Sequence, residues 1–244
     1  MTSASIMFYL LLFTAAFLYS SVGHGGASGY LALMIFFSYP PETIRSLVLL
    51  LNIFVSGIAF IQYYRAGHFK WDIFWPFAIT SIPAAFIGGL VTVDVNIYKK
   101  IIAVLLILSA LRLFKIKLNY ERSITVRSVP LALLIGVCIG FFSGMIGIGG
   151  GIILSPVLLF LNWADIKSAA AVSALFIFVN SAAGLAGASV IKFEYKNEFW
   201  VMLFLVVAGG TLGSYLGAKK LESKALSRLL AAILLIASIK LISF

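Results

Sequence analysis

Long apolar stretches separated by short polar and basic segments run along the whole chain. They lie at about residues 43–64, 73–91 and 97–114 in the first half, and at about 168–191, 199–217 and 225–241 in the second. A helix needs about 20 apolar residues to cross the hydrocarbon layer of a membrane. The pattern therefore predicts an all-α, polytopic helical membrane protein, because helices satisfy their own backbone hydrogen bonds in lipid.

Each half also contains an apolar element that glycines interrupt. In the second half this element covers residues 130–161, which is too long for one helical crossing and short for two crossings joined by a surface loop. We expect it to enter the membrane, break at Gly147–Gly151, and turn back or continue as a short half-helix. Unpaired backbone groups at lipid depth are tolerated only where they are buried in protein or line a watery cavity. The break therefore indicates a site.

The two halves repeat one pattern. Ser21, Gly25 and Gly29 match Ser143, Gly147 and Gly151 at a constant offset (143 − 21 = 122), and the same offset pairs residues 44–46 with 166–168. Self-similarity of this kind indicates a tandem duplication. We expect a first transmembrane repeat over residues 1–114, a basic linker over 115–127 and a second transmembrane repeat over 128–244.

The basic residues favour inverted repeats. If each interrupted element makes no net crossing, the loops near residues 65–72, 112–128, 162–168 and 218–228 share a side and hold 12 of the 18 Lys and Arg residues. If each element crosses once, the halves are parallel and the division is 10 to 8. The positive-inside rule favours the inverted arrangement, with the linker cytoplasmic and both termini outside.

Composition excludes other classes of protein. The chain is 62% apolar and 11% charged, with a mean hydropathy of +1.12, against about half apolar and a quarter charged in soluble domains. A soluble enzyme, a nucleic-acid binder and a disulfide scaffold are therefore excluded. The net charge of +10 comes from Lys and Arg between apolar segments, where they face lipid head groups. We expect the lipid bilayer as a partner, and no nucleic acid.

The interior offers hydrogen-bond donors rather than carboxylates. All eight acidic residues lie in or beside predicted loops, which argues against a cation substrate, because cation carriers commonly hold Asp or Glu inside the bundle. Helix N-termini bind anions, and two broken helices would aim theirs at one point near the midplane. We therefore expect a small anion between Ser21–Gly29 and Ser143–Gly151, with no catalytic residue, metal or cofactor. The expected contacts are Ser21, His24, Gly25, Gly26, Ser28, Gly29, Asn52, Ser143, Gly147, Gly149, Gly150, Gly151 and Asn180.

These residues also have structural interpretations. Glycines in membrane helices are often packing surfaces, although here clusters of three or more recur in both halves. His24 is either a structural donor or the residue that binds a coupling proton. Asn52 and Asn180 are either interhelical donors or substrate contacts.

An enzyme is the hypothesis from another class. Gly26-Ala27-Ser28-Gly29 spells the G-x-S-G found around the nucleophile of intramembrane serine proteases. Such a protease needs a histidine from a second membrane helix to activate the serine. Outside the motif's own segment the candidate is His68, in a predicted loop, so this hypothesis is weak and we expect no enzymatic activity.

The segment Gly140-Phe141-Phe142-Ser143-Gly144-Met145-Ile146-Gly147-Ile148-Gly149-Gly150-Gly151, followed by Pro156, resembles the TauE/SafE family of bacterial and archaeal membrane proteins. The resemblance covers essentially the whole chain. The first half departs from this signature, with Val22, His24, Ala27 and Ser28 where the second half has Gly144, Ile146, Gly149 and Gly150.

The resemblance implies transport of sulfite, sulfoacetate or another organosulfonate by a multi-pass protein of the cell inner (plasma) membrane, without an organic cofactor. Within transport, an uptake permease for a sulfonate and a passive anion channel are the alternatives. The family is usually described with about eight crossings, which results if each broken element is drawn as one crossing.

Overall fold

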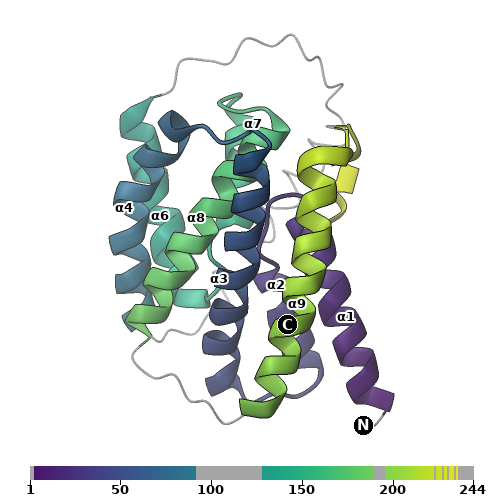
Figure 1. The fold of residues 1–244 in the computed structure, drawn as a ribbon. Coiled ribbons are helices and arrows are strands. Elements are labelled where there is room, and N and C mark those ends of the chain that lie inside the picture. Colours follow the sequence, from purple (N-terminus) through teal and green to yellow (C-terminus); the bar gives the residue numbers. More distant parts are fainter. Residues whose placement is uncertain are drawn as a thin grey trace.

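The computed structural model describes residues 3–91, 128–188 and 196–222, with short helical pieces between residues 224 and 235. Every regular element in these ranges is helical (Figure 1). The first half contains α1 (Ser3–Ser20), α2 (Ala27–Phe36), α3 (Pro41–Arg65) and α4 (Trp71–Leu90). The second half contains α6 (Val129–Ile146), α7 (Gly151–Phe160), α8 (Ile166–Gly187), α9 (Lys196–Tyr215) and a π-helical turn, η1 (Leu216–Lys220). The predicted stretch at 97–114, the linker at 115–127 and part of the stretch at 225–241 lie outside the described residues.

The predicted helical membrane protein is confirmed. In the described residues, five helical segments are long and apolar enough to cross a membrane: Thr43–Arg65, Trp71–Leu90, Val129–Ile146, Ile166–Gly187 and Glu198–Lys220. Three shorter apolar helices, α1, α2 and α7, flank the breaks. Large apolar side chains also cover the outside of the bundle, with Phe204 71% exposed and Leu134 62% exposed. Such a surface suits contact with lipid, because it would be unusual on a soluble monomer.

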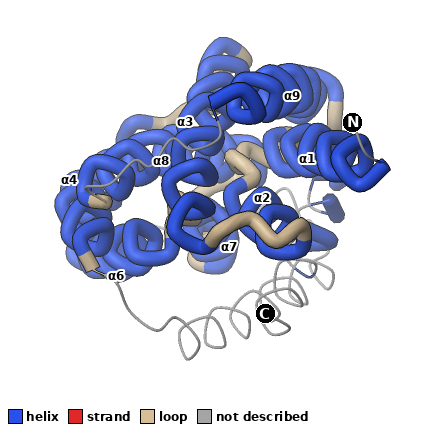
Figure 2. The backbone as a smooth tube through the Cα atoms, turned by 90° about the horizontal axis from the view of Figure 1, so that it is seen from below, coloured by secondary structure: helices blue, strands red, loops and turns tan. Residues whose placement is uncertain are grey.

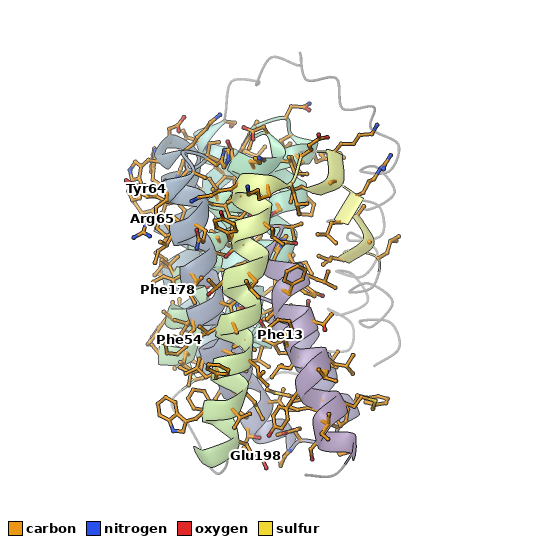
Figure 3. The ribbon with its side chains drawn as sticks, turned by 45° about the vertical axis from the view of Figure 1, so that its right-hand side comes forward. Phe13, Phe54, Tyr64, Arg65, Phe178 and Glu198 are labelled. Carbon is orange, nitrogen blue, oxygen red and sulfur yellow. The ribbon has the colours of Figure 1, made fainter. Side chains whose placement is uncertain are left out.

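Contacts between loops define two ends of the bundle. At the His68 end, His68 Nε2 donates to the carbonyl oxygen of Ala218 (3.2 Å), and Lys70 Nζ lies 3.6 Å from Asp165 Oδ2. At the Glu198 end, Tyr39 Oη donates to Glu198 Oε2 (3.1 Å). Figure 3 shows Glu198 and Arg65 at opposite ends of the molecule.

Equivalent helices of the two halves run in opposite directions between these ends. α3 begins just after Tyr39, at the Glu198 end, whereas α8 begins just after Asp165, at the His68 end. Inverted halves require this relationship. The inverted repeat as a whole stays a prediction, because part of each half lies outside the described residues.

Both broken elements are hairpins inside the bundle. α6 runs parallel to α4 from the His68 end, since Gly136, Gly140 and Gly144 lie against Phe77, Ser81 and Ala85 in the same order. α7 then leads back to Asp165 at that same end. α1 and α2 form the opposite hairpin: the ring of Phe8 in α1 stacks on Tyr39, just beyond α2, at the Glu198 end. Figure 2 shows α6 beside α4 and α1 beside α9.

Each hairpin packs against a long helix through three glycines. In one pair the glycines lie on the hairpin, and in the other they lie on the long helix. In one pair, Gly136, Gly140 and Gly144 of α6 touch the backbone of α4. In the other pair, Gly209, Gly213 and Gly217 belong to α9 and η1, and they touch the carbonyl oxygens of Phe13, Phe17 and Ser21. A Cβ at any of these six glycines would come within 3.0 Å of a carbonyl oxygen. Small residues therefore allow the close approach that holds each hairpin against a crossing helix.

Candidate functional site

The two breaks meet in the middle of the bundle. The first break lies between Ser20 and Ala27, and the second between Ile146 and Gly151. His24 in the first break donates from Nε2 to the carbonyl oxygen of Gly151 (3.0 Å), which joins the two breaks directly. The order of elements places them there, because each hairpin enters from its own end of the bundle.

Glycine makes both breaks possible. Gly26 (φ 98°) precedes α2, and Gly150 (φ 75°) precedes α7. These left-handed backbone conformations suit glycine because it has no Cβ. Neither N-terminus has a side-chain cap. The first backbone N–H groups of a helix lack partners within it and form its positive dipole end, so both breaks place the positive end of a short helix near the bundle centre.

A small cavity lies between the breaks. Its volume is about 10 Å³, enough for about one water molecule. Its walls come from Tyr19, His24, Gly25, Gly26, Ala27 and Ser28 on one side and from Ile148, Ile152 and Ile177 on the other. Ser28 Oγ donates to Tyr19 Oη (2.9 Å), and Tyr30 Oη donates to the carbonyl oxygen of Gly25 (2.7 Å). The first half therefore supplies the polar wall and the second half the apolar wall.

Unpartnered polar atoms gather around the breaks. In the described part of the chain, the buried side-chain atoms without a hydrogen-bond partner are His24 Nδ1, Arg45 Nε, Asn52 Oδ1, Ser143 Oγ and Asn180 Oδ1. Four of these five residues belong to the set that the sequence predicts. Leaving a buried polar group unpaired costs about 1–3 kcal/mol, so their concentration in one region indicates a place for a ligand or water.

Asn52 connects both breaks to the two central helices. Its Nδ2 donates to Ser181 Oγ (2.8 Å), from α3 to α8. A Cβ at Gly25 or at Gly149 would overlap the Asn52 amide. Asn180 lies one residue before Ser181, and its Nδ2 donates to Ser81 Oγ (3.1 Å) and to the carbonyl oxygen of Phe176 (2.8 Å). Both amides thus act as interhelical donors and keep one oxygen unpaired.

Two further predicted donors, besides those of Ser28, His24 and the two amides, are already paired in this conformation. Ser21 Oγ, just after α1, donates to the carbonyl oxygen of Leu18 (2.6 Å) in the last turn of that helix. The backbone N–H of Gly147 donates to the carbonyl oxygen of Ser143 (2.9 Å) and ends α6. Contact of either group with a substrate stays a prediction that requires these bonds to open.

Arg45 is the residue near the breaks that the sequence argument missed. This half-buried side chain of α3 donates from Nη2 to the carbonyl oxygens of Gly88 (3.3 Å), Gly89 (2.9 Å) and Gly144 (2.5 Å). Its Cγ also packs against Gly147. No carboxylate of the described residues forms an ion pair with it. The sequence feature that could have identified Arg45 is the 122-residue offset, which pairs it with another basic residue, Lys167.

The protease hypothesis finds no support in the described contacts. Ser28 Oγ donates to Tyr19, and His24 Nε2 donates to Gly151. His68 contacts Ala218 at the far end of the bundle. Neither histidine forms a hydrogen bond to Ser28 in the described residues.

Similarity to known proteins agrees with this architecture. The chain matches the family described as Sulfite exporter TauE/SafE over residues 8–241. It is 34% identical to the probable membrane transporter protein y4hK of Sinorhizobium fredii, over 99% of this chain and 100% of the relative. It is 28% identical to the probable membrane transporter protein ORF9 of a Sinorhizobium species, over 97% and 92% of the two chains. No solved structure matches the chain. The protein therefore belongs to the TauE/SafE family of membrane transporters.

Proposed function

We propose that this transporter carries a small sulfur-containing anion, such as sulfite, sulfoacetate or another organosulfonate, across the cell inner (plasma) membrane. The anion binds between the N-termini of α2 and α7. The observation that carries the proposal is the meeting of two uncapped helix N-termini through the bond from His24 to Gly151, with four further unpartnered polar atoms nearby. Free backbone donors and positive dipole ends favour an oxyanion.

The distribution of charge also supports an anion. No Asp or Glu among the residues whose side chains the structure describes is buried, and Asp165 and Glu198 are exposed at the two ends of the bundle. The charged side chain beside the second break is Arg45, which is positive. A cation at this place would face a guanidinium and no carboxylate, so an anion is favoured electrostatically.

The size of the cavity supports a carrier rather than a passive anion channel. The space between the breaks holds about one water molecule, which is much smaller than a sulfonate group. An anion enters only if the α1–α2 and α6–α7 hairpins move apart. A site that opens and closes in this way suits alternating access between the two sides of the membrane.

The test is a flux assay with the purified protein in proteoliposomes. Radiolabelled sulfite, sulfoacetate and methanesulfonate are offered separately, with chloride and Na⁺ as competitors. We expect saturable uptake of at least one sulfur anion, and no competition by Na⁺. Absence of saturable uptake of all three anions would overturn the proposed substrate class, and flux that does not saturate would identify a channel.

A further inference from the structure

His24 combines complete burial with one unused ring nitrogen. The side chain is 1% exposed, and its Nε2 is held by the carbonyl oxygen of Gly151. A carbonyl oxygen only accepts hydrogen bonds, so Nε2 carries the hydrogen. In the neutral imidazole, Nδ1 is then an acceptor, and it has no partner. His24 is also one of the residues that line the cavity beside the N-terminus of α2.

An anion in this cavity would meet Nδ1 in the wrong protonation state. A sulfonate or sulfite dianion offers only acceptor oxygens, and neutral Nδ1 is also an acceptor, so the two repel each other. Addition of one proton converts Nδ1 into a donor and gives the ring a positive charge. A charge-assisted hydrogen bond from N–H to the anion then replaces the repulsion. Binding of the anion and binding of a proton to His24 are therefore linked.

Among the described side chains around the breaks, His24 is the one suited to taking up the proton. Among the described residues, the titratable or charged side chains that face this region are Tyr19 of α1, Tyr30 of α2, and Arg45 and Tyr63 of α3. The second break and α8 contribute Ile148, Ile152 and Ile177, which do not titrate. Tyrosine ordinarily loses its proton near pH 10, and arginine keeps its charge. Histidine is the side chain among them whose unperturbed pKa lies between pH 5 and 8.

We infer that His24 couples transport to protons: its Nδ1 takes up one proton with each anion and releases it when the anion leaves. This inference rests on the proposed function, because it needs an anion at the breaks. With a monovalent sulfonate the loaded site gains no net charge, so transport is electroneutral and one proton accompanies each anion. A pH difference of one unit then sustains about a tenfold concentration ratio of the anion.

The chain provides a matched control for the test. It has two histidines, and both donate from Nε2 to a distant backbone carbonyl oxygen: His24 to Gly151 and His68 to Ala218. Glutamine keeps an amide donor near the position of Nε2 but binds no proton. His24→Gln therefore removes the proton site and keeps the hydrogen bond across the breaks, whereas His68→Gln makes the same chemical change at the end of the bundle.

Two transport measurements separate the proposals. The probes are labelled sulfite and methanesulfonate, the second of which keeps its charge over this pH range. We expect the wild type and His68→Gln to accumulate methanesulfonate about tenfold across one pH unit. His24→Gln should lose the Nδ1–H donor to the anion, so it should exchange labelled for unlabelled anion only with a raised KM and should reach an accumulation ratio of about 1. Accumulation by His24→Gln as in the wild type would overturn the inference and leave the proposed function intact, whereas absence of exchange of both anions in the wild type would overturn both.

A second measurement uses only the wild type, so it tests the coupling even if the His24→Gln variant does not fold. Saturating methanesulfonate is added to the purified protein in weakly buffered detergent at neutral pH, and a pH-sensitive dye reports proton uptake. We expect uptake of about one proton per protein that binds anion. Anion binding without a change in pH would contradict the coupling.

Discussion

Arg45 Nη2 lies 2.9 Å from the carbonyl oxygen of Gly89, at the C-terminus of α4, and the same nitrogen donates to Gly144 near the C-terminus of α6. Helix C-termini carry partial negative charge. Two such ends point toward the region in which the proposed anion binds, and they would repel it. Arg45 places a positive charge at both ends and satisfies three carbonyl oxygens at once.

Neutralisation of Arg45 should therefore weaken both folding and transport. Arg45→Gln removes the charge and leaves carbonyl oxygens unpaired, at about 1–3 kcal/mol for each buried group. We expect a lower melting temperature in detergent and at least about a tenfold rise in KM for the anion, which corresponds to about 1.4 kcal/mol. The control is Lys167→Gln, at the equivalent position of the second half. Among the described contacts, the Lys167 side chain forms no hydrogen bond to a helix end. A normal KM in Arg45→Gln would show that the charge only stabilises the fold.

Ser143 should affect binding without affecting stability. Its hydroxyl is buried and has no partner, so Ser143→Ala removes an unsatisfied group. If the hydroxyl donates to the anion, its loss costs about 1.5–3 kcal/mol, or a roughly tenfold to hundredfold loss of affinity. Isothermal titration and thermal unfolding in detergent measure the two effects on one sample.

Ser155→Ala is the control for Ser143→Ala, because it should change stability and not affinity. Ser155 Oγ donates to Ser173 Oγ (2.7 Å) inside the bundle, between α7 and α8. Removal of this buried bond should lower the melting temperature and leave the affinity for the anion unchanged. Normal anion binding by Ser143→Ala would place the binding site elsewhere.

Gly150 is constrained by packing as well as by its backbone conformation. Its φ is 75°, and an added Cβ would lie 2.7 Å from Ile139 Cγ2 and 2.9 Å from Ser143 Oγ. Gly67 has a similar φ of 78°, but nothing lies within 4 Å of an added Cβ. Gly67→Ala should therefore cost only backbone strain, about 1–2 kcal/mol, whereas Gly150→Ala should lower the melting temperature further. Equal losses of stability in the two variants would show that Ile139 and Ser143 move aside easily.

The long helices and the position of the second break could be predicted from sequence. α3 and α8 follow from apolar stretches of about the length that crosses a membrane, and the density of glycines indicates the end of α6 at Ile146. The separate roles of neighbouring glycines are harder to predict. Gly140 and Gly144 lie one helical turn apart and pack on α4, whereas Gly147 and Gly150 have positive φ and break the chain. A spacing of four residues indicates the first role, and a loss of that spacing indicates the second.

Contacts between the halves could not be predicted from one sequence. His24 meets Gly151 across 127 residues, and Asn52 meets Ser181 across 129. Periodicity describes only neighbours along the chain, so it identifies these residues as polar but not as partners. Arg45 was missed for a related reason. An arginine near the end of an apolar stretch usually snorkels to the membrane surface, and only the fold brings the ends of α4 and α6 to its guanidinium.

The direction of the helices predicts which loops share a side of the membrane. Arg65 is the last residue of α3, and Lys220 is the last residue of η1. The bond from His68 to Ala218 holds these two segments at one end. Glu198 lies at the start of α9, about 20 residues before Lys220, which at 1.5 Å per residue is roughly the thickness of the hydrocarbon layer. Cysteines placed at Arg65 and Lys220 should therefore lie on one side of the membrane, and a cysteine placed at Glu198 on the other.

We expect Arg65→Cys and Lys220→Cys to react with an impermeant maleimide from the same side of the membrane, and Glu198→Cys from the opposite side. The background is Cys138→Ser, because Cys138 is the single native cysteine and is exposed on α6. Lys117→Cys, in the linker outside the described residues, extends the test: inverted halves place it with Lys220. Labelling of Lys117→Cys and Lys220→Cys from opposite sides would exclude the inverted arrangement, and labelling of Arg65→Cys together with Glu198→Cys would contradict the fold itself.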